Sequence, residues 1–280
     1  MADDPQLPAT AGARMTALRV VPAFTLGSRR SMRLIERNLY VYRHGWMILL
    51  SGFFEPLFYL LGIGFGLGAL VGTIPGPDGQ EISYQLFVAP ALLASAAMNG
   101  AITESTFNFF FKLNYNKTFA SILSTPLSPG DVALGELGWA LIRGGLYAIG
   151  FMGVMLVLGL FASPWVILAV PAALLVGFAF GAVGMAATSF MKTWQDFDLI
   201  QLVILPMFLF SGTFYPIDAY PEAIQLFIRL TPLYQGVDLI RSLTVGAISP
   251  ILLVHVAYLA IMGFIGLAVT SRRLDKLLLK

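Results

Sequence analysis

The chain has 280 residues, of which 58% are hydrophobic and only 11% are charged, and its formal net charge is +2 at pH 7. Soluble domains carry about 25% charged residues, so this chain has too few charges to build a water-facing surface. The composition predicts a polytopic membrane protein, and the small net charge gives no reason to expect a nucleic-acid partner. The absence of cysteine excludes disulfides and thiolate metal sites.

The N-terminal part divides into a tail and a helix. Residues 1–27 are polar and rich in proline and alanine, without the apolar segment of a signal peptide, and we expect a disordered cytosolic tail. Residues 28–45 predict an amphipathic helix in the membrane interface, with arginines toward anionic headgroups. Its apolar stripe consists of Met32, Ile35, Leu39, Tyr42 and the following Trp46. The alternative, a surface helix of a soluble domain, is disfavoured by the apolar run that follows directly.

Six apolar runs follow, each close to the ~20 residues that cross the hydrocarbon core of a bilayer. They are Trp46–Val71, Ile82–Phe111, Val132–Phe161, Val166–Met191, Phe197–Tyr215 and Pro250–Thr270. They predict an all-α polytopic fold with six transmembrane helices within residues 46–270. We expect a glycine- and proline-rich loop at Val71–Glu81.

The positions of lysine and arginine predict the orientation. Seven arginines precede the first run, and a basic tail, residues 271–280, follows the last. Lys112, Lys117 and Lys192 lie in breaks on the same side, whereas the opposite side holds only Arg229 and Arg241. Because cytoplasmic loops are enriched in basic residues, both termini are predicted to be cytoplasmic.

The polar segment Leu113–Asp131 interrupts two long runs on the cytoplasmic side. Phe119, Ile122 and Leu123 have helical spacing, so residues 113–127 are expected to contain a short helix with one apolar edge. Ser128 to Asp131 has the pattern of a helix N-cap, a first-turn proline and an acidic third residue.

The long connection late in the chain runs from Pro216 to Ser249, and its helical part is residues 216–245. One short helix is predicted after Pro221 and ends at Thr231, and a second runs from Tyr234 to Leu243. Apolar-rich segments of this length are more often interfacial or re-entrant than spanning, so we expect two short re-entrant helices in the outer leaflet.

Four charges lie within or at the ends of the runs: Glu55, Glu104, Glu136 and Arg143. Because burying a charge in a bilayer is costly, they mark either a proton or substrate path or structural pairs between helices. Glu136 and Arg143 share one helix face, and structural pairing near the cytosolic interface is the favoured reading for them, whereas for Glu55, beside Pro56, the two readings are open.

Motifs for chemistry are nearly absent. There is no phosphate loop of the G-x-x-x-x-G-K-[ST] type, and His44 and His255 lack a metal-binding spacing. The glycines that alternate from Gly62 to Gly68 favour close helix packing or a bend. The chain is therefore predicted not to be an enzyme.

Several stretches in order resemble a known family. They are EPLFYLLGIGFGLG (Glu55–Gly68), TPLSPGDVALGEL (Thr125–Leu137), SGTFYPI (Ser211–Ile217) and TPLYQGVDLIR (Thr231–Arg241). With the sixfold pattern, they resemble the ABC-2-type permeases, most closely the branch of nodulation lipo-oligosaccharide exporters with relatives in drug, lipid and polysaccharide export. The chain departs from the family signature at Gln235, where His, Arg, Ser or Tyr is usual.

The resemblance implies the permease of an exporter for an amphiphilic substrate in the bacterial inner membrane. It implies two ABC ATPase subunits, which bind the ATP and Mg, and a second permease, the same or related, in a lipid environment. Residues 113–127 then correspond to the coupling helix, with Asn114, Tyr115, Lys117, Phe119, Ile122 and Leu123 as the ATPase-coupling residues. The outer gate region would contain Phe214, Tyr215, Pro232, Tyr234 and Arg241.

Two other classes stay open. A proton-coupled secondary transporter would use Glu55 and Glu104, and would lose transport on Glu55→Gln; such transporters often contain inverted repeats, and none is evident. An integral-membrane lipid transferase would need a cluster of acids or histidines at one interface, and the sequence offers no convincing one.

Overall fold

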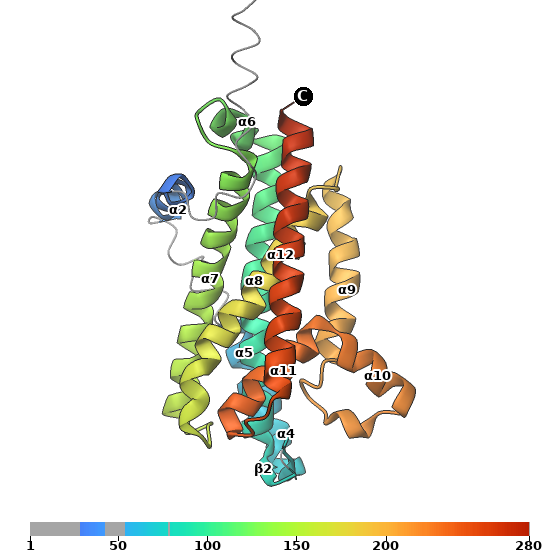
Figure 1. Ribbon diagram of the computed structural model, residues 1–280. Helices are drawn as coiled ribbons and strands as arrows, with labels where there is room; N and C mark the ends of the chain where they lie inside the picture. The colour runs from blue at the N-terminus through green and yellow to red at the C-terminus, as the bar shows by residue number, and fades with distance from the viewer. Residues whose placement is uncertain (1–28, 43–53, 78, 280) are drawn as a thin grey trace, which may run out of the picture.

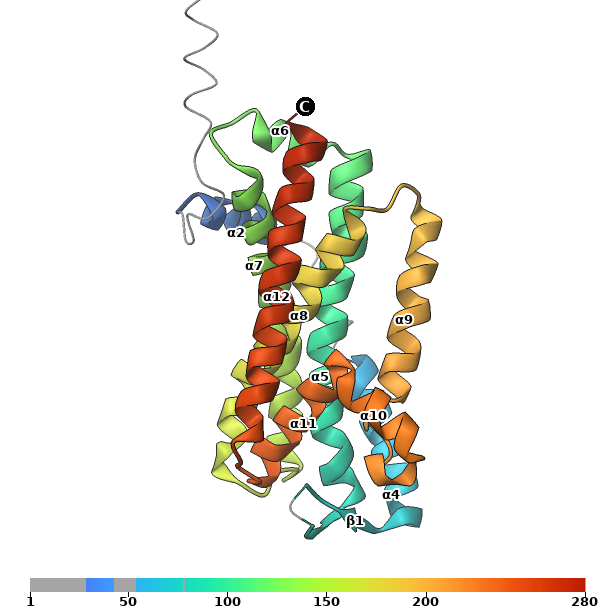
Figure 2. The ribbon, with the colours of Figure 1, turned by 45° about the vertical axis from the view of Figure 1, so that its right-hand side comes forward.

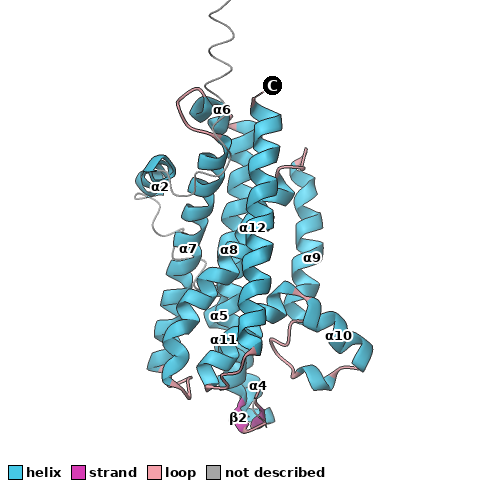
Figure 3. Ribbon diagram, in the orientation of Figure 1, coloured by secondary structure: helices cyan, strands magenta, loops and turns pink. Residues whose placement is uncertain are grey.

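The computed structural model describes residues 29–42, 54–77 and 79–279, and these form a bundle of long helices (Figures 1 and 3). The predicted tail 1–27, the start of the first run and Lys280 lie outside the described residues. The α-helices are α2 (Arg29–Tyr42), α4 (Gly66–Val71), α5 (Tyr84–Thr103), α6 (Thr118–Leu123), α7 (Pro129–Val157), α8 (Ala169–Thr188), α9 (Phe197–Leu209), α10 (Glu222–Leu230), α11 (Pro232–Val245) and α12 (Ile251–Leu278).

Five helical segments of the described chain are long and apolar enough to cross a membrane. They are Phe54–Val71, Tyr84–Tyr115, Pro129–Val157, Pro164–Thr188 and Ile251–Leu278. Each corresponds to a predicted run, and α12 continues beyond the predicted end into the basic tail, as far as Leu278. The bundle has α6 and the C-terminus at one end, the α6 end, and α4 with the strands at the other, the hairpin end (Figure 1).

The remaining predicted run is shorter than expected. α9 has 13 residues, and at a rise of 1.5 Å per residue it covers only about 20 Å of the ~30 Å hydrocarbon core. The helix ends at Leu209, and Phe210–Tyr215 continues as turns around Gly212, whose φ is +70°. α9 has no buried residue and stands at the side of the bundle in both views (Figures 1 and 2).

The predicted loop at Val71–Glu81 contains a small antiparallel hairpin. Strand β1 (Thr73–Pro75) pairs with β2 (Glu81–Ser83), and Ile74 faces Ile82 across the pair. Both isoleucines are buried on the apolar core, whereas their neighbours in each strand are exposed. The alternation of one apolar residue between exposed ones explains why this segment, expected as an irregular loop, forms strands.

The glycine series on the first helix packs closely at only one position. A Cβ at Gly68 would lie 2.5 Å from the Gln85 side chain of α5, but nothing lies within 4 Å of a Cβ at Gly62 or Gly66. The segment Leu60–Phe65 is a π-helical turn, a local widening that bends helices. Close packing against another helix, the favoured reading of these glycines, is therefore found at Gly68, and the π-helical turn includes Gly62 and Gly64.

α2 lies across α7, but not on the face that its apolar stripe predicts. Leu34 and Asn38 are buried, whereas Met32 and Leu39 are 55% and 59% exposed. The helix is turned toward Asn38 because Gly135 of α7 leaves room for Leu34: a Cβ at Gly135 would lie 2.7 Å from the Leu34 Cβ. The exposed pair remains free to face lipid.

The contact with Gly135 predicts a stability difference between two alanine substitutions. Gly135→Ala meets the Leu34 Cβ and, at 3.0 Å, the Ser31 backbone oxygen, whereas Gly138→Ala meets only the end of the flexible Ile35 side chain. Overpacking costs about 1–3 kcal/mol, so Gly135→Ala should release α2 to protease while Gly138→Ala leaves it protected. Equal cleavage rates in the two variants would contradict this packing.

The centre of the bundle depends on close approach of α8 and α12. A Cβ at Gly266 of α12 would lie 2.7 Å from backbone atoms of Ala182 and Val183 in α8. Small residues at a helix interface allow backbones to approach and gain packing energy in a membrane, where the hydrophobic effect does not drive helix association. α8 therefore packs against α5, α7 and α12 (Figure 1).

Candidate functional site

A short helix and a buried ion-pair network lie near the α6 end and form the candidate site. The last turns of Tyr84–Tyr115 are π-helical, at Glu104–Asn108 and Phe111–Tyr115. Lys117, with φ of +48°, then reverses the chain into α6. The predicted helix within 113–127 is thus shorter than expected, because Leu113–Tyr115 completes the preceding helix.

α6 is fastened by its apolar edge. Phe119 is fully buried and its ring centroid lies 4.9 Å from that of Phe109, and Leu123 is also buried. They belong to a cluster, here called the α6 cluster, with residues of α2, α7, α8 and α12: Leu34, Phe109, Phe119, Leu123, Val132, Ala133, Leu137, Ala182, Met185, Leu267 and Leu274. Five helices therefore meet under α6, because Phe109 belongs to the helix Tyr84–Tyr115.

The six predicted coupling residues divide between two surfaces. Asn114, Tyr115 and Lys117 are exposed, Ile122 is half-buried, and Phe119 and Leu123 face the α6 cluster. The last two are covered by the bundle, so any part they have in coupling would be through the packing of α6 rather than through direct contact with a partner. Burial of these side chains is the physical reason: the edge anchors the helix.

The helix after α6 begins as its sequence predicts. The Ser128 hydroxyl accepts a hydrogen bond from the Asp131 N–H, and the Asp131 carboxylate accepts one from the Ser128 N–H at 3.0 Å. This capping box fixes where α7 starts. The guanidinium of Arg30 donates to the Pro126 carbonyl at 3.0 Å, so α2 also holds the segment between α6 and α7.

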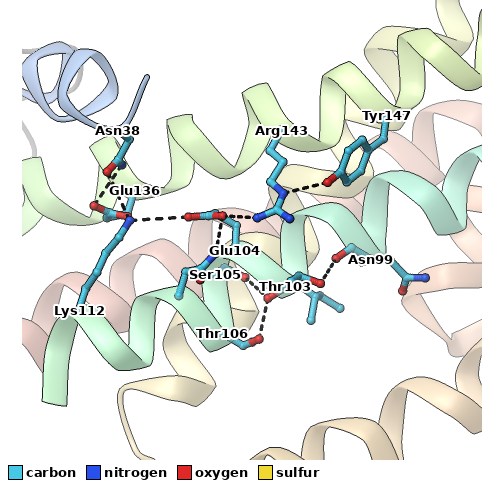
Figure 4. A network of polar contacts seen from close by, with 12 residues as sticks. Asn38, Asn99, Thr103, Glu104, Ser105, Thr106, Lys112, Glu136, Arg143 and Tyr147 are labelled. Carbon is cyan, nitrogen blue, oxygen red and sulfur yellow. Dashed lines mark hydrogen bonds and ion pairs between the residues drawn. The ribbon is translucent and has the colours of Figure 1, made fainter. Parts of the chain in front are cut away.

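Directly beneath, four buried charges form the ion-pair network, which consists of Glu104, Lys112, Glu136 and Arg143 (Figure 4). Arg143 Nη1 lies 2.7 Å from Glu104 Oε2, and Lys112 Nζ lies 2.6 Å from Glu136 Oε2. Lys112 Nζ is also 3.6 Å from Glu104 Oε1, so one chain of contacts joins all four. Two acids balance two bases, which makes their joint burial tolerable.

Neutral side chains extend the network to other helices. Asn38 of α2 donates to Glu136 Oε1 at 3.3 Å, and Arg143 Nε donates to the Tyr147 hydroxyl at 3.0 Å. Tyr42 stacks on Trp139 with centroids 5.1 Å apart. Burial, followed by the nearby charge of Glu104, raises the pKa of Tyr42 to about 12, so its phenol stays neutral.

Glu136 and Arg143 therefore lie on one face of α7, and each pairs with a residue of the helix that leads to α6. Sequence reasoning treated Lys112 only as a topological charge and missed Asn38 and Tyr147. The sequence signal for this network was the spacing of the charged residues on two apolar runs. That spacing indicates which charges share a helix face, but not which residues they pair with. Glu55 is not part of the network and lies in a separate cleft.

At the hairpin end, Arg241, one of the predicted outer residues, is buried. Its guanidinium donates to the carbonyls of Phe87, at 3.1 Å, and Gly212, at 2.6 Å, and lies 3.6 Å from the Phe87 ring centroid. Burial lowers the pKa of Arg241 to about 10, so the group remains charged at neutral pH. Phe214 is buried, Tyr215 is exposed, and Pro232 and Tyr234 are half-buried at the start of α11.

His255 is a further member of this region that the sequence reasoning set aside. The Gln235 amide donates to the Arg229 carbonyl, which turns its oxygen toward His255 Nδ1. The other ring nitrogen, Nε2, lies 3.0 Å from an Asp238 oxygen. These two contacts tie α11 to α12.

This arrangement predicts that His255→Phe loosens α11. The phenyl ring has similar size but no donors, and it leaves the Asp238 carboxylate without its partner, at a cost of about 1–3 kcal/mol. Hydrogen exchange of the α11 amides should therefore speed up, with little change in α6. The matched control is His255→Lys, which retains a donor toward Asp238; identical exchange in wild type and the phenylalanine variant would refute the tie.

The comparisons with known proteins agree with this architecture. Residues 31–245 match the ABC-2 type transporter family. The chain belongs to the ABC-2 type transporter family. As an ABC-2 permease, it is a multi-pass transport subunit rather than an enzyme, which confirms the prediction of family and class. The family implies an ABC ATPase as partner.

Relatives match over most of the permease. A protein named Nodulation protein J from Rhizobium leguminosarum bv. trifolii is 33% identical over 260 residues, 91% of this chain and 97% of the relative. Proteins of the same name from Rhizobium meliloti and Bradyrhizobium diazoefficiens are 34% and 33% identical, covering 81% of this chain and 86% of each relative.

Proposed function

We propose that this permease exports an amphiphilic substrate, such as a drug, a glycolipid or a lipid-linked saccharide, out of the bacterial cytoplasm. ATP and Mg would be bound by separate ATPase subunits, and α6 would be the element on which they act. The substrate would be moved by conformational change alone, because the permease itself offers no phosphate loop.

One observation carries the proposal: α6 is exposed on one side and anchored on the other in a cluster shared with five other helices. A force applied to Tyr115 and Lys117 would reach α7 and α12 through Phe119, and α2 through Arg30. The π-helical turns beside α6 are local departures from regular helix of the kind that often lies at functional sites. The ion-pair network would keep α2, α5 and α7 moving together.

The orientation and assembly belong to the same proposal. The excess of basic residues at the α6 end supports a cytoplasmic α6 and cytoplasmic termini. A sixth span would combine α9 with the turns that follow it, and α10 and α11 would be the re-entrant helices of an outer gate. The exposed leucines of α9, with no buried residue among them, support a second permease, same or related, beside it. Two ATPase subunits would complete the complex.

The test is export from cells or inverted vesicles that contain the permease with and without its ATPase. We expect vanadate-sensitive, ATP-dependent transport that stops when the ATPase is removed and persists when a protonophore collapses the proton gradient. Export that continues without the ATPase would refute the proposal. Export that the protonophore alone abolishes would favour a proton-coupled transporter.

The geometry gives that alternative little support at Glu104. Its carboxylate lies 2.7 Å from the Arg143 guanidinium and accepts a hydrogen bond from Asn108 at 2.7 Å. The Glu104 side chain is 1% exposed and its carboxylate is occupied by these partners, so it is not presented to an open path for a cycling proton. Glu55 is the remaining candidate, and its surroundings point to a different ligand.

A further inference from the structure

A cleft between three helices brings Glu55 together with polar and aromatic side chains. It lies between Phe54–Val71, α5 and α9, has an interior volume of only about 10 Å³, and adjoins an open surface hollow of about 540 Å³ that shares Glu55 and Tyr59 with it. Its lining includes Glu55, Tyr59, Ser95, Asn99 and Phe208. The three helices belong to different parts of the chain, so the site exists only in the folded protein.

Two of these polar groups have no partner in the part of the chain that the structure describes. Neither the Glu55 carboxylate nor the Asn99 carboxamide takes part in a hydrogen bond or ion pair there, whereas Glu104 and Glu136 are both paired. Among the residues that the structure describes, no lysine or arginine lines the cleft. The Glu55 side chain is exposed at its mouth, so an acidic group without a basic neighbour in the described chain is open to a ligand.

Aromatic rings surround that charge. The centroids of Tyr59 and Phe208 are 5.7 Å apart, and Phe54 stacks with Phe58 at 6.0 Å. Phe54, Phe58 and Tyr59 also line a hollow next to Glu55 on the surface of the first helix. Ring faces attract organic cations, and a carboxylate adds the counter-charge. A neutral ligand would use the rings but leave the carboxylate uncompensated.

We propose that the hollow at the mouth of this cleft binds the positively charged group of an amphiphilic ligand, an organic ammonium or another large monovalent cation. Glu55 is the counter-ion, Tyr59 and Phe208 contact the cation with their rings, and Asn99 accepts or donates a hydrogen bond at its polar edge. The inference deepens the proposed function, on which it rests, by naming the class of substrate that the permease accepts.

The experiment measures binding to the full-length chain in lipid nanodiscs without ATP. The probe is ethidium, a fluorescent cation of permanent charge, and the comparison probe is N-phenyl-1-naphthylamine, which is neutral. Glu55→Gln should weaken ethidium binding by about tenfold or more, a change of about 1.4 kcal/mol. Glu55→Asp, which keeps the charge, and Glu81→Gln in the exposed hairpin should retain it, and no variant should alter binding of the neutral probe.

Unchanged ethidium affinity in Glu55→Gln would overturn the proposal, as would an equal loss of affinity for the neutral probe. Phe208→Leu provides a second test if the glutamine variant does not fold: it should weaken ethidium binding alone, and equal effects on both probes reject the site. Because binding is measured without an ATPase, failure here is distinct from failure of ATP-driven export. Export that is vanadate-sensitive but indifferent to Glu55 would reject only this inference.

Discussion

Arg143→Gln is expected to destabilise the folded permease by about 3–5 kcal/mol, because it leaves the Glu104 carboxylate buried with only partial compensation. The Glu104 side chain is 1% exposed, and its shortest ion-pair contact is the 2.7 Å contact with Arg143. Lys112, at 3.6 Å and already bound to Glu136, cannot replace the guanidinium. Thermal and denaturant unfolding in detergent measure the loss.

The matched control is Arg33→Gln. Arg33 and Glu36 form an ion pair of 2.8 Å, but their side chains are 78% and 55% exposed. Exposed pairs contribute about 0–1 kcal/mol, so this variant should unfold close to wild type. The double variant Glu104→Gln with Arg143→Gln removes both charges and should recover most of the stability. A single variant that is as stable as the control would show that the buried pair is not needed.

Recovery of stability separates the structural role from a role in transport. If the double variant folds but exports poorly, the charges themselves matter for motion between α5 and α7. If it folds and exports like the wild type, the network only stabilises the fold. Both outcomes concern the transport step. The comparison of Arg143→Gln with Arg33→Gln decides whether burial increases the contribution of an ion pair to stability.

Phe119→Ala is expected to detach α6 and to abolish ATP-driven export while the spans remain folded. Removing a fully buried phenylalanine costs about 3–5 kcal/mol, and α6 has only six residues with which to resist it. A helix so short is not stable without its anchor. Accessibility of a cysteine placed at Ser121, together with vanadate-sensitive export, measures both effects.

Phe161→Ala serves as the control for this variant. Phe161 lies in the turn after α7 at the hairpin end and is 40% exposed, so the same truncation should cost little there. Tyr115→Ala complements it, because Tyr115 is 59% exposed beside α6. This variant should weaken contact with the ATPase and so reduce export, without loosening α6. Wild-type export from Phe119→Ala would contradict the idea that α6 transmits force.

The sequence by itself determined the class of this protein and the positions of most helices. Long apolar runs have no stable place outside a bilayer, so their existence and approximate bounds follow from hydropathy. The capping residues Ser128 and Asp131 specify the start of α7 locally, and the two helices between Pro221 and Val245 follow from proline punctuation and spacing. Hydropathy, capping residues and helical spacing are properties of a short segment, and they do not depend on the rest of the fold.

Only the tertiary structure decided which residues meet. Leu34 and Asn38, rather than Met32 and Leu39, became the buried side of α2 because a glycine on α7 leaves room for Leu34. Lys112 pairs with a carboxylate 24 residues away in sequence, and Arg143 with one 39 residues away. The periodicity of a single helix cannot predict such pairs, because the partners lie on different helices. Glu55 acquired its cleft from α5 and α9. Which residues pair between helices depends on how each helix is rotated about its axis and how deep it lies in the bundle. A single sequence indicates which residues share a helix face, but not which neighbouring helix covers that face.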